Sequence, residues 1–139
     1  MTVPSVQDVR QKNLIVILAR EFASKLATPT LVADAAGTLV YFNETAESFL
    51  GRSFAETGEV PLHEWSNVFD LREDDGTPMP PESRPGATVL RKHQPVHRNF
   101  CITTLDGVTR RISATVFPLF SQPDELAGIM SIFWERPKE

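Results

Sequence analysis

The chain has 139 residues, a length that suits one domain with its own hydrophobic core. Hydrophobic residues make up 41% of it and charged residues 23%, a composition that excludes a disordered polar tail. The formal charge of -4 leaves no basic excess to neutralise phosphates, which argues against nucleic acid as a partner.

The cysteine content and the apolar runs limit the cellular context. Cys101 is the only cysteine, so neither an intrachain disulfide nor a zinc site built from cysteines can form. The longest apolar run, residues 14–19, is far shorter than the roughly 20 residues that cross a bilayer. Arg20 and Glu21 end this run without a small-residue cleavage site, unlike a signal peptide. We therefore expect a cytoplasmic protein with no membrane partner.

Residues 5–27 predict an amphipathic helix, because they contain no glycine or proline. Apolar residues at spacings of three and four form one stripe along this helix, and they are Leu14, Ile17, Leu18, Phe22 and Leu26. Ile15 points away from the stripe, so apolar surface wraps further round the helix. Residues 1–27 are therefore either a cap on the domain of residues 28–136 or a dimer seam.

Residues 30–43 predict a β-hairpin followed by a short helix. Two runs rich in β-branched and aromatic residues flank a turn that ends at Gly37, which tolerates the positive φ of a tight reversal. Asn43 can cap the next helix, and Gly51 can end it.

The middle of the chain is rich in turn signals. Trp65 and Leu71 are apolar anchors within a stretch that we expect to be irregular and packed over the domain as a lid. Pro80 and Pro81 predict the start of a longer helix that ends before Gln94-Pro95, because the residue before a proline is pushed out of the helical region.

Three β-strands are expected at the C-terminal end, at residues 96–104, 108–120 and 126–135. Asp106-Gly107 is a strong hairpin signal between the first two. With the opening hairpin, these strands predict an α+β fold with five antiparallel strands and helices on one face. The last strand is apolar on both sides, so it should be central, with the N-terminal helix covering its second face.

This order of elements resembles a PAS domain over about residues 24–135. The Asp34-to-Gly37 turn, the Asn43 stop, the Asp106-Gly107 hairpin and the run from Asp75 to Glu82 are similar to those of bacterial signalling PAS modules. The resemblance implies a strand order of 2-1-5-4-3, a pocket between the sheet and the helices, and a sensory function without catalysis. It also implies a homodimer that acts on a downstream signalling protein.

Two sets of residues follow from that resemblance. The expected ligand pocket for a small apolar molecule consists of Phe42, Phe49, Trp65, Leu90, Phe100, Ile102, Ile112, Ala114 and Val116. The expected dimer interface, on the leading helix and the outer sheet face, consists of Leu14, Ile15, Ile17, Leu18, Phe22, Ile129 and Phe133. The alternative to a pocket is that the first set fills the core completely.

No cofactor or metal is required by the sequence. Haem is one alternative, because haem-binding PAS domains place an iron-ligating histidine where His93 and His97 stand, although the surrounding motif is not reproduced. Flavin is disfavoured, because Cys101 lies on a strand and not in the Asn-Cys-Arg motif of flavin-binding PAS domains. Two further alternatives are a small α+β enzyme with a cone-shaped fold, although no catalytic constellation is found, and an interaction module without a ligand.

Overall fold

The opening hairpin forms as predicted in the computed structural model of the chain, which describes residues 6–67, 70–104 and 106–137. It consists of β1 (Thr30–Asp34) and β2 (Leu39–Phe42). Gly37 has a φ of 88°, and an added Cβ there would lie 3.1 Å from side-chain carbons of Leu62 and Leu90. The turn therefore needs glycine both for its backbone and for its packing.

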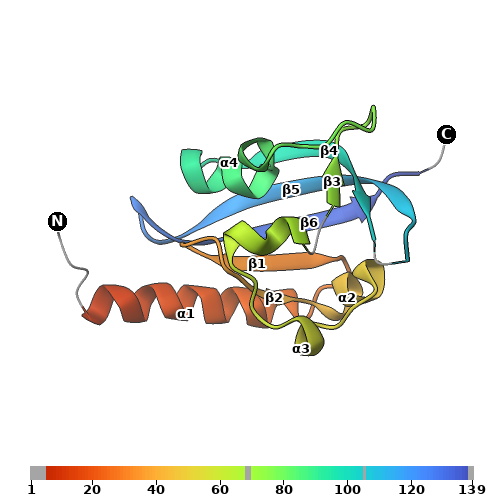
Figure 1. Cartoon of the computed structure of the whole chain (residues 1–139). Helices are drawn as coiled ribbons and strands as arrows, with labels where there is room; N and C mark the ends of the chain where they lie inside the picture. Colours follow the sequence, from red (N-terminus) through yellow and green to blue (C-terminus); the bar gives the residue numbers. More distant parts are fainter. Residues whose placement is uncertain (1–5, 68–69, 105, 138–139) are drawn as a thin grey trace.

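The sheet has six antiparallel strands in the spatial order β2-β1-β6-β5-β4-β3 (Figure 1). The strands after the hairpin are β3 (Asp70–Arg72), β4 (Val96–Thr103), β5 (Thr109–Gln122) and β6 (Glu125–Glu135). The predicted α+β class and the order of the five expected strands are confirmed. The additional strand β3 lies in the stretch predicted to be irregular. Its three residues are too few to show an alternating pattern, and they pair with the free edge of β4.

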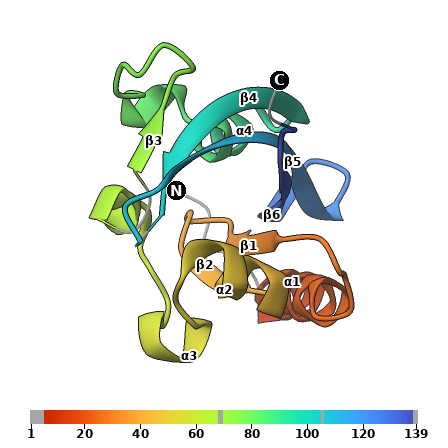
Figure 2. The ribbon, with the colours of Figure 1, turned by 90° about the vertical axis from the view of Figure 1, so that its right-hand side faces the viewer.

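Helices lie on both sides of this curled sheet (Figure 2). The α-helices are α1 (Val6–Ala23), α2 (Glu44–Leu50), α3 (Phe54–Thr57) and α4 (Pro85–Lys92). The 3-10 helices are η1 (Leu62–Asn67) and η2 (Pro81–Ser83). Helix α4 and η1 pack on the concave face, whereas α1 packs on the opposite face.

Helix α1 packs on the sheet through small residues, which the apolar stripe did not indicate. Ala19 and Ala23 are buried against Val32 and Met130. The predicted stripe points away from the sheet, with Leu14, Ile17, Leu18 and Phe22 between 53% and 57% exposed. These four side chains are therefore on the exposed side of the helix, and their assignment to a dimer interface stays a prediction. The sheet supplies the bulky side chains of this contact, so the helix approaches closely only through alanine.

Helix α1 ends at Ala23, four residues earlier than predicted, and its predicted first residue, Ser5, lies outside the described residues. The early end is explained by Asn43, whose Nδ2 donates to the carbonyl oxygens of Ala23 and Thr28 at 2.9 Å and of Leu26 at 3.3 Å. A distant side chain thus satisfies the carbonyl groups at the end of the helix.

Asn43 also joins the two elements on either side of it. Its Oδ1 accepts hydrogen bonds from the backbone amides of Thr30 and Ala46, both at 3.0 Å. The second of these bonds confirms the predicted N-cap of α2. One buried amide side chain therefore links α1, β1 and α2.

The predicted helix after Pro80-Pro81 is divided in two. Arg84 separates η2 from α4 with φ of -67° and ψ of 145°, an extended conformation. Pro85 is the cause, because proline pushes the preceding residue out of the helical region, the same effect that was predicted at Gln94-Pro95.

Strand β6 lies between β1 and β5, so its predicted central position is confirmed. Met130 and Ile132 contact α1, whereas Ile129 and Phe133 point to the concave face and are 2% and 3% exposed. Placing Ile129 and Phe133 on an outer dimer surface was therefore wrong. Because both sides of the strand are apolar, alternation alone did not indicate which side faces outward.

Candidate functional site

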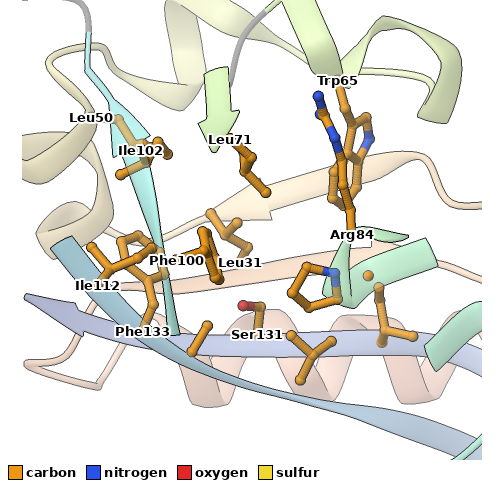
Figure 3. Close-up of a pocket in the computed structure, with 15 residues that line it drawn as sticks. Leu31, Leu50, Trp65, Leu71, Arg84, Phe100, Ile102, Ile112, Ser131 and Phe133 are labelled. Atoms are coloured by element: carbon orange, nitrogen blue, oxygen red, sulfur yellow. The ribbon is translucent and has the colours of Figure 1, made fainter. Parts of the chain in front are cut away.

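An apolar cavity of about 70 Å³ lies between the concave face of the sheet and the segments that cover it (Figure 3). Strands β4, β5 and β6 form its floor, and β3, η1 and the start of α4 close it from the other side. Its walls are Leu31, Leu50, Trp65, Leu71, Arg84, Pro85, Gly86, Phe100, Ile102, Ile112, Ala114, Val116, Ile129, Ser131 and Phe133.

Six of the nine residues predicted to form a pocket lie in this wall. They are Trp65, Phe100, Ile102, Ile112, Ala114 and Val116. Strand alternation brings the β4 and β5 members together on one face, because every second side chain of a strand points the same way. That these residues bind a ligand stays a prediction.

The other three predicted pocket residues pack beside the cavity. The ring of Phe42 meets Phe54 edge to face, with centroids 5.3 Å apart. Phe49 packs in the same way on Phe133 at 5.2 Å. Leu90 contacts the buried cluster around Val89. These side chains support the cavity wall from behind and do not line it.

Two polar side chains line the cavity together with the indole of Trp65. Ser131 places a hydroxyl on the floor, and the side chain of Arg84 lies beside Trp65 (Figure 3). The indole Nε1 of Trp65 donates to the carbonyl oxygen of Val60 at 3.1 Å, which fixes the ring. Arg84 was not among the predicted pocket residues, although a proline follows it and therefore favours an extended conformation at this position.

A second, open groove of about 630 Å³ adjoins the cavity. It is lined by Leu62, His63, Trp65, Pro81, Glu82, Arg84, Ala87 and Arg91. Trp65 and Arg84 belong to both linings and therefore stand between the inner cavity and the outer groove.

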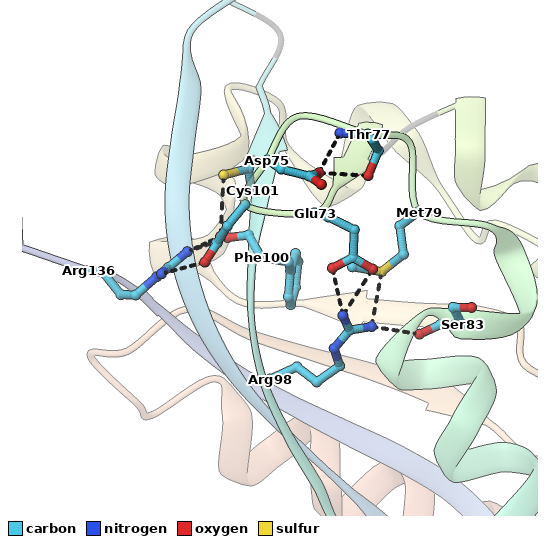
Figure 4. A network of polar contacts seen from close by, with 10 residues as sticks. Glu73, Asp75, Thr77, Met79, Ser83, Arg98, Phe100, Cys101 and Arg136 are labelled. Atoms are coloured by element: carbon cyan, nitrogen blue, oxygen red, sulfur yellow. Dashed lines mark hydrogen bonds and ion pairs between the residues drawn. The ribbon is translucent and has the colours of Figure 1, made fainter.

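The cover of the cavity includes residues 70–84, which we call the strap. Arg98 of β4 holds the strap near both ends: it pairs with Glu73 at 2.7 Å and donates to the carbonyl oxygen of Ser83 at 3.0 Å (Figure 4). Both groups of the Arg98–Glu73 pair are partly buried, and Arg98 also donates to the sulfur of Met79 at 3.7 Å. The strap, and with it the position of Arg84, is thus tied to the sheet.

A second arginine holds the strap next to Glu73. Arg136 forms a bidentate pair with Asp74, with nitrogen–oxygen distances of 2.7 and 3.1 Å (Figure 4). It also donates to the carbonyl oxygens of Phe100 and Ile112. The hydrogen bond from Arg136 lowers the pKa of Asp74 below its ordinary value of 3.8. Burial raises the pKa of the neighbouring Cys101 thiol, and the Asp74 carboxylate raises it further.

The Asp74–Arg136 pair predicts a dependence of stability on pH. Because folding lowers the pKa of Asp74, the pair stabilises the protein fully above the ordinary pKa, and the contribution is lost as pH falls through the lowered value. We expect the free energy of unfolding of Asp74→Asn to be lower than that of the wild type at pH 6, and the difference to vanish in strong acid. Urea unfolding from pH 6 to pH 2 measures it.

Asp124→Asn is the control, because it removes a carboxylate from the β5–β6 turn that makes no ion pair with the described residues. A difference between wild type and Asp74→Asn that stays constant down to pH 2 would contradict the assigned role of the pair.

The residues considered for cofactors lie away from the cavity. His93 is exposed at the end of α4, and exposed His97 has its ring centroid 5.9 Å from that of Trp134. Neither histidine lines the cavity, so the described residues do not fit the expectation of a haem ligand. Cys101 contacts Asp74 instead of the cavity. Among the described residues, no group of three or more histidine, cysteine, aspartate or glutamate side chains could hold a metal ion.

The residues expected at a dimer interface divide into two groups. Leu14, Ile17, Leu18 and Phe22 form an exposed apolar patch on α1, and Ile15 is half-buried beside it. Ile129 and Phe133 line the cavity.

Within the described part of the chain, no helix has the length and apolar character needed to cross a bilayer.

Comparison with known proteins identifies the fold. No curated protein matches the chain. Among solved structures, the PAS domain of Bordetella pertussis BvgS has a TM-score of 0.64 and 19% identity, and the match covers 88% of this chain and 87% of that one. The PAS domain of the nitrogen regulation protein NR(II) from Vibrio parahaemolyticus has a TM-score of 0.60 and 18% identity over 86% and 98%.

The Rhodobacter sphaeroides LOV protein has a TM-score of 0.67 and 12% identity, over 93% of this chain and 69% of that one. A family model described as the PAS fold matches residues 24–136, which include the strap, α4 and every strand. With the curled sheet, the order of its strands and the cavity beneath the strap, this match shows that the chain belongs to the PAS family.

Proposed function

We propose that this PAS domain is a sensory module that binds a small molecule with an apolar body in the inner cavity and signals through a homodimer to a downstream protein. The observation that carries the proposal is the apolar cavity beneath the strap. Apolar cavities with few polar groups are typical of small-molecule sites. The described lining contains no carboxylate, histidine or cysteine, which favours binding over catalysis.

Strand β6 supplies a route from the cavity to α1. Ile129 and Ser131 face the cavity, whereas Met130 and Ile132, next to them in the chain, contact α1. A ligand that shifts the first pair also shifts the second, because successive side chains of a strand share one backbone. The apolar patch on α1 then transmits the shift to a partner copy.

Binding of an apolar probe tests the cavity directly. A ligand of the folded state at ten times its Kd stabilises it by about 1.4 kcal/mol, which corresponds to a rise in Tm of roughly 4 °C. We expect xenon to raise the Tm of the wild type and to have little effect on Ala114→Val, in which two added methyl groups occupy the cavity. Thermal unfolding followed by circular dichroism under xenon measures both.

Thr115→Val is the matched control for Ala114→Val, because Thr115 is the next residue of β5 and does not line the cavity. It should respond to xenon as the wild type does. Equal Tm values with and without xenon in the wild type would contradict the proposed ligand site.

The patch on α1 predicts the second part of the proposal. Burying an apolar side chain of this size contributes about 1.5–3 kcal/mol, so Leu14, Ile17, Leu18 and Phe22 together can hold two copies in contact. We expect Leu18→Glu and Phe22→Glu to reduce the mass in solution from twice the 15.5 kDa of one chain to a single chain. Light scattering coupled to size exclusion measures the mass.

Asn13→Glu is the control, because it places the same charge on an exposed position on the flank of α1. It should leave the mass unchanged. Dimers of unaltered stability in both patch variants would show that α1 is not the interface.

A further inference from the structure

Arg84 is a cation without an ion pair in the part of the chain that the structure describes. Its Nε is buried without a hydrogen-bond partner, and its guanidinium forms no ion pair with any described residue. Burial also lowers the pKa of Arg84, which shows that the group is partly withdrawn from water. A buried N–H without an acceptor on a partly buried cation is costly, and a bound anion that accepts from it removes the cost.

The acidic groups near Arg84 have other partners or are exposed. Asp70 is the acid whose charge acts on Arg84, but its carboxylate lies 3.4 Å from Arg72. Glu73 pairs with Arg98. Glu82 lines the outer groove and is exposed. No carboxylate of the described chain therefore forms an ion pair with the guanidinium of Arg84.

The backbone holds Arg84 in this position before any ligand arrives. The extended conformation imposed by Pro85 takes Arg84 out of both helices and places it at the boundary of cavity and groove. Arg98 fixes the preceding residue through the carbonyl oxygen of Ser83. A binding group held in place in this way loses little conformational entropy when it engages a ligand.

We propose that the ligand is a short-chain carboxylate, with its apolar tail in the inner cavity and its carboxylate paired with Arg84. The inference rests on the proposed function of the cavity and adds the chemical class of the ligand. A guanidinium presents parallel N–H donors that match a planar carboxylate. Arg91 adds a second positive charge further out in the groove.

The cavity volume sets the length of the tail. At roughly 30 Å³ for each water-sized group, a volume of about 70 Å³ holds two or three carbon groups. The carboxylate and the carbon next to it then lie in the opening, between Trp65 and Arg84. This geometry fits acids of about four or five carbons, and longer chains require the cavity to expand.

Pentanoate and pentanamide are the matched probes, because they share a tail and differ in charge. Titration calorimetry with the full chain should show pentanoate binding ten- to a hundred-fold tighter, the usual range for a hydrogen bond to a charged group. Arg84→Met should remove this preference and bind the two probes equally. Arg84→Lys keeps the positive charge but loses the two parallel N–H donors of the guanidinium, so it should retain part of the preference for pentanoate.

Arg91→Met is the control for a loss of positive charge in the groove, and we expect it to change pentanoate affinity by less than threefold. Thermal unfolding shows whether each variant folds, and Arg84→Met should be at least as stable as the wild type because it loses an unpaired buried group.

Equal affinity of the wild type for pentanoate and pentanamide, or full pentanoate affinity in Arg84→Met, would overturn the role of Arg84 and leave the ligand cavity intact. Absence of binding by both probes overturns the inferred ligand class. If xenon also fails to stabilise the wild type, the proposed function of the cavity fails as well.

Discussion

Asn43→Ala is expected to destabilise the protein by about 3–5 kcal/mol, because it leaves buried polar groups without partners, each of which costs about 1–3 kcal/mol. The two amides that donate to Asn43 Oδ1, those of Thr30 and Ala46, lose this acceptor in the variant. The carbonyl oxygens of Ala23 and Thr28 keep a second donor, so they add less. Urea unfolding at neutral pH measures the loss.

Ser53→Ala is the control for Asn43→Ala, since Ser53 also caps a helix, accepting from the amide of Glu56 at 3.1 Å. That bond is exposed and links no other element, so its loss should cost about 0.5–1 kcal/mol. Asn43→Asp separates the acceptor role of Asn43 from its donor role. The variant keeps an oxygen that accepts from the two amides, but it places a carboxylate oxygen against the three carbonyl oxygens to which Nδ2 donates. Equal losses in Asn43→Ala and Ser53→Ala would mean that Asn43 is only a local cap.

Gly128→Ala is expected to cost about 3 kcal/mol or more, at the upper end of overpacking effects. A Cβ on Gly128 would lie 2.3 Å from the carbonyl oxygen of Ala33, an impossible contact. That oxygen belongs to the backbone of β1, which is paired with β6 along its whole length, so it cannot move without breaking the ladder. The free energy of unfolding and the hydrogen exchange of β1 amides measure the effect.

Gly86→Ala is the control for Gly128→Ala, because it adds the same methyl group at a position with space for it. The nearest atom to an added Cβ is a ring carbon of Trp65 at 3.4 Å, an ordinary contact. Alanine is favoured over glycine within a helix by about 1 kcal/mol, so this variant should be as stable as the wild type or more so. A loss in Gly128→Ala no greater than in Gly86→Ala is incompatible with the close β1–β6 contact.

Much of the sheet could be predicted because its signals are local. Gly37 and the pair Asp106-Gly107 mark the reversals, and the residues between them alternate or run apolar as strands do. The N-cap of Asn43 was predicted in the same way. Its bonds to the end of α1 were not, because they join residues up to 20 positions apart that only the folded chain brings together.

The orientation of α1 depends on the partner surface and not on the helix. Periodicity predicts which residues share a side, but Ala19 and Ala23 face the sheet only because Met130 and Val32 already fill the space above it. For the cavity, alternation in β4 and β5 was sufficient to predict most of the floor. Arg84 was missed because the proline rule was not applied at Pro85, where it would have ended the first helical turn.

In the function that we propose, the alternation of β6 assigns recognition and output to different positions of the same strand. Side chains at 129, 131 and 133 line the cavity, and those at 130 and 132 contact α1. Substitutions in the first set can therefore retune which molecule is accepted while the helix contact keeps its shape. Such a strand allows a sensor to acquire a new ligand and still transmit the signal through the same contact with α1.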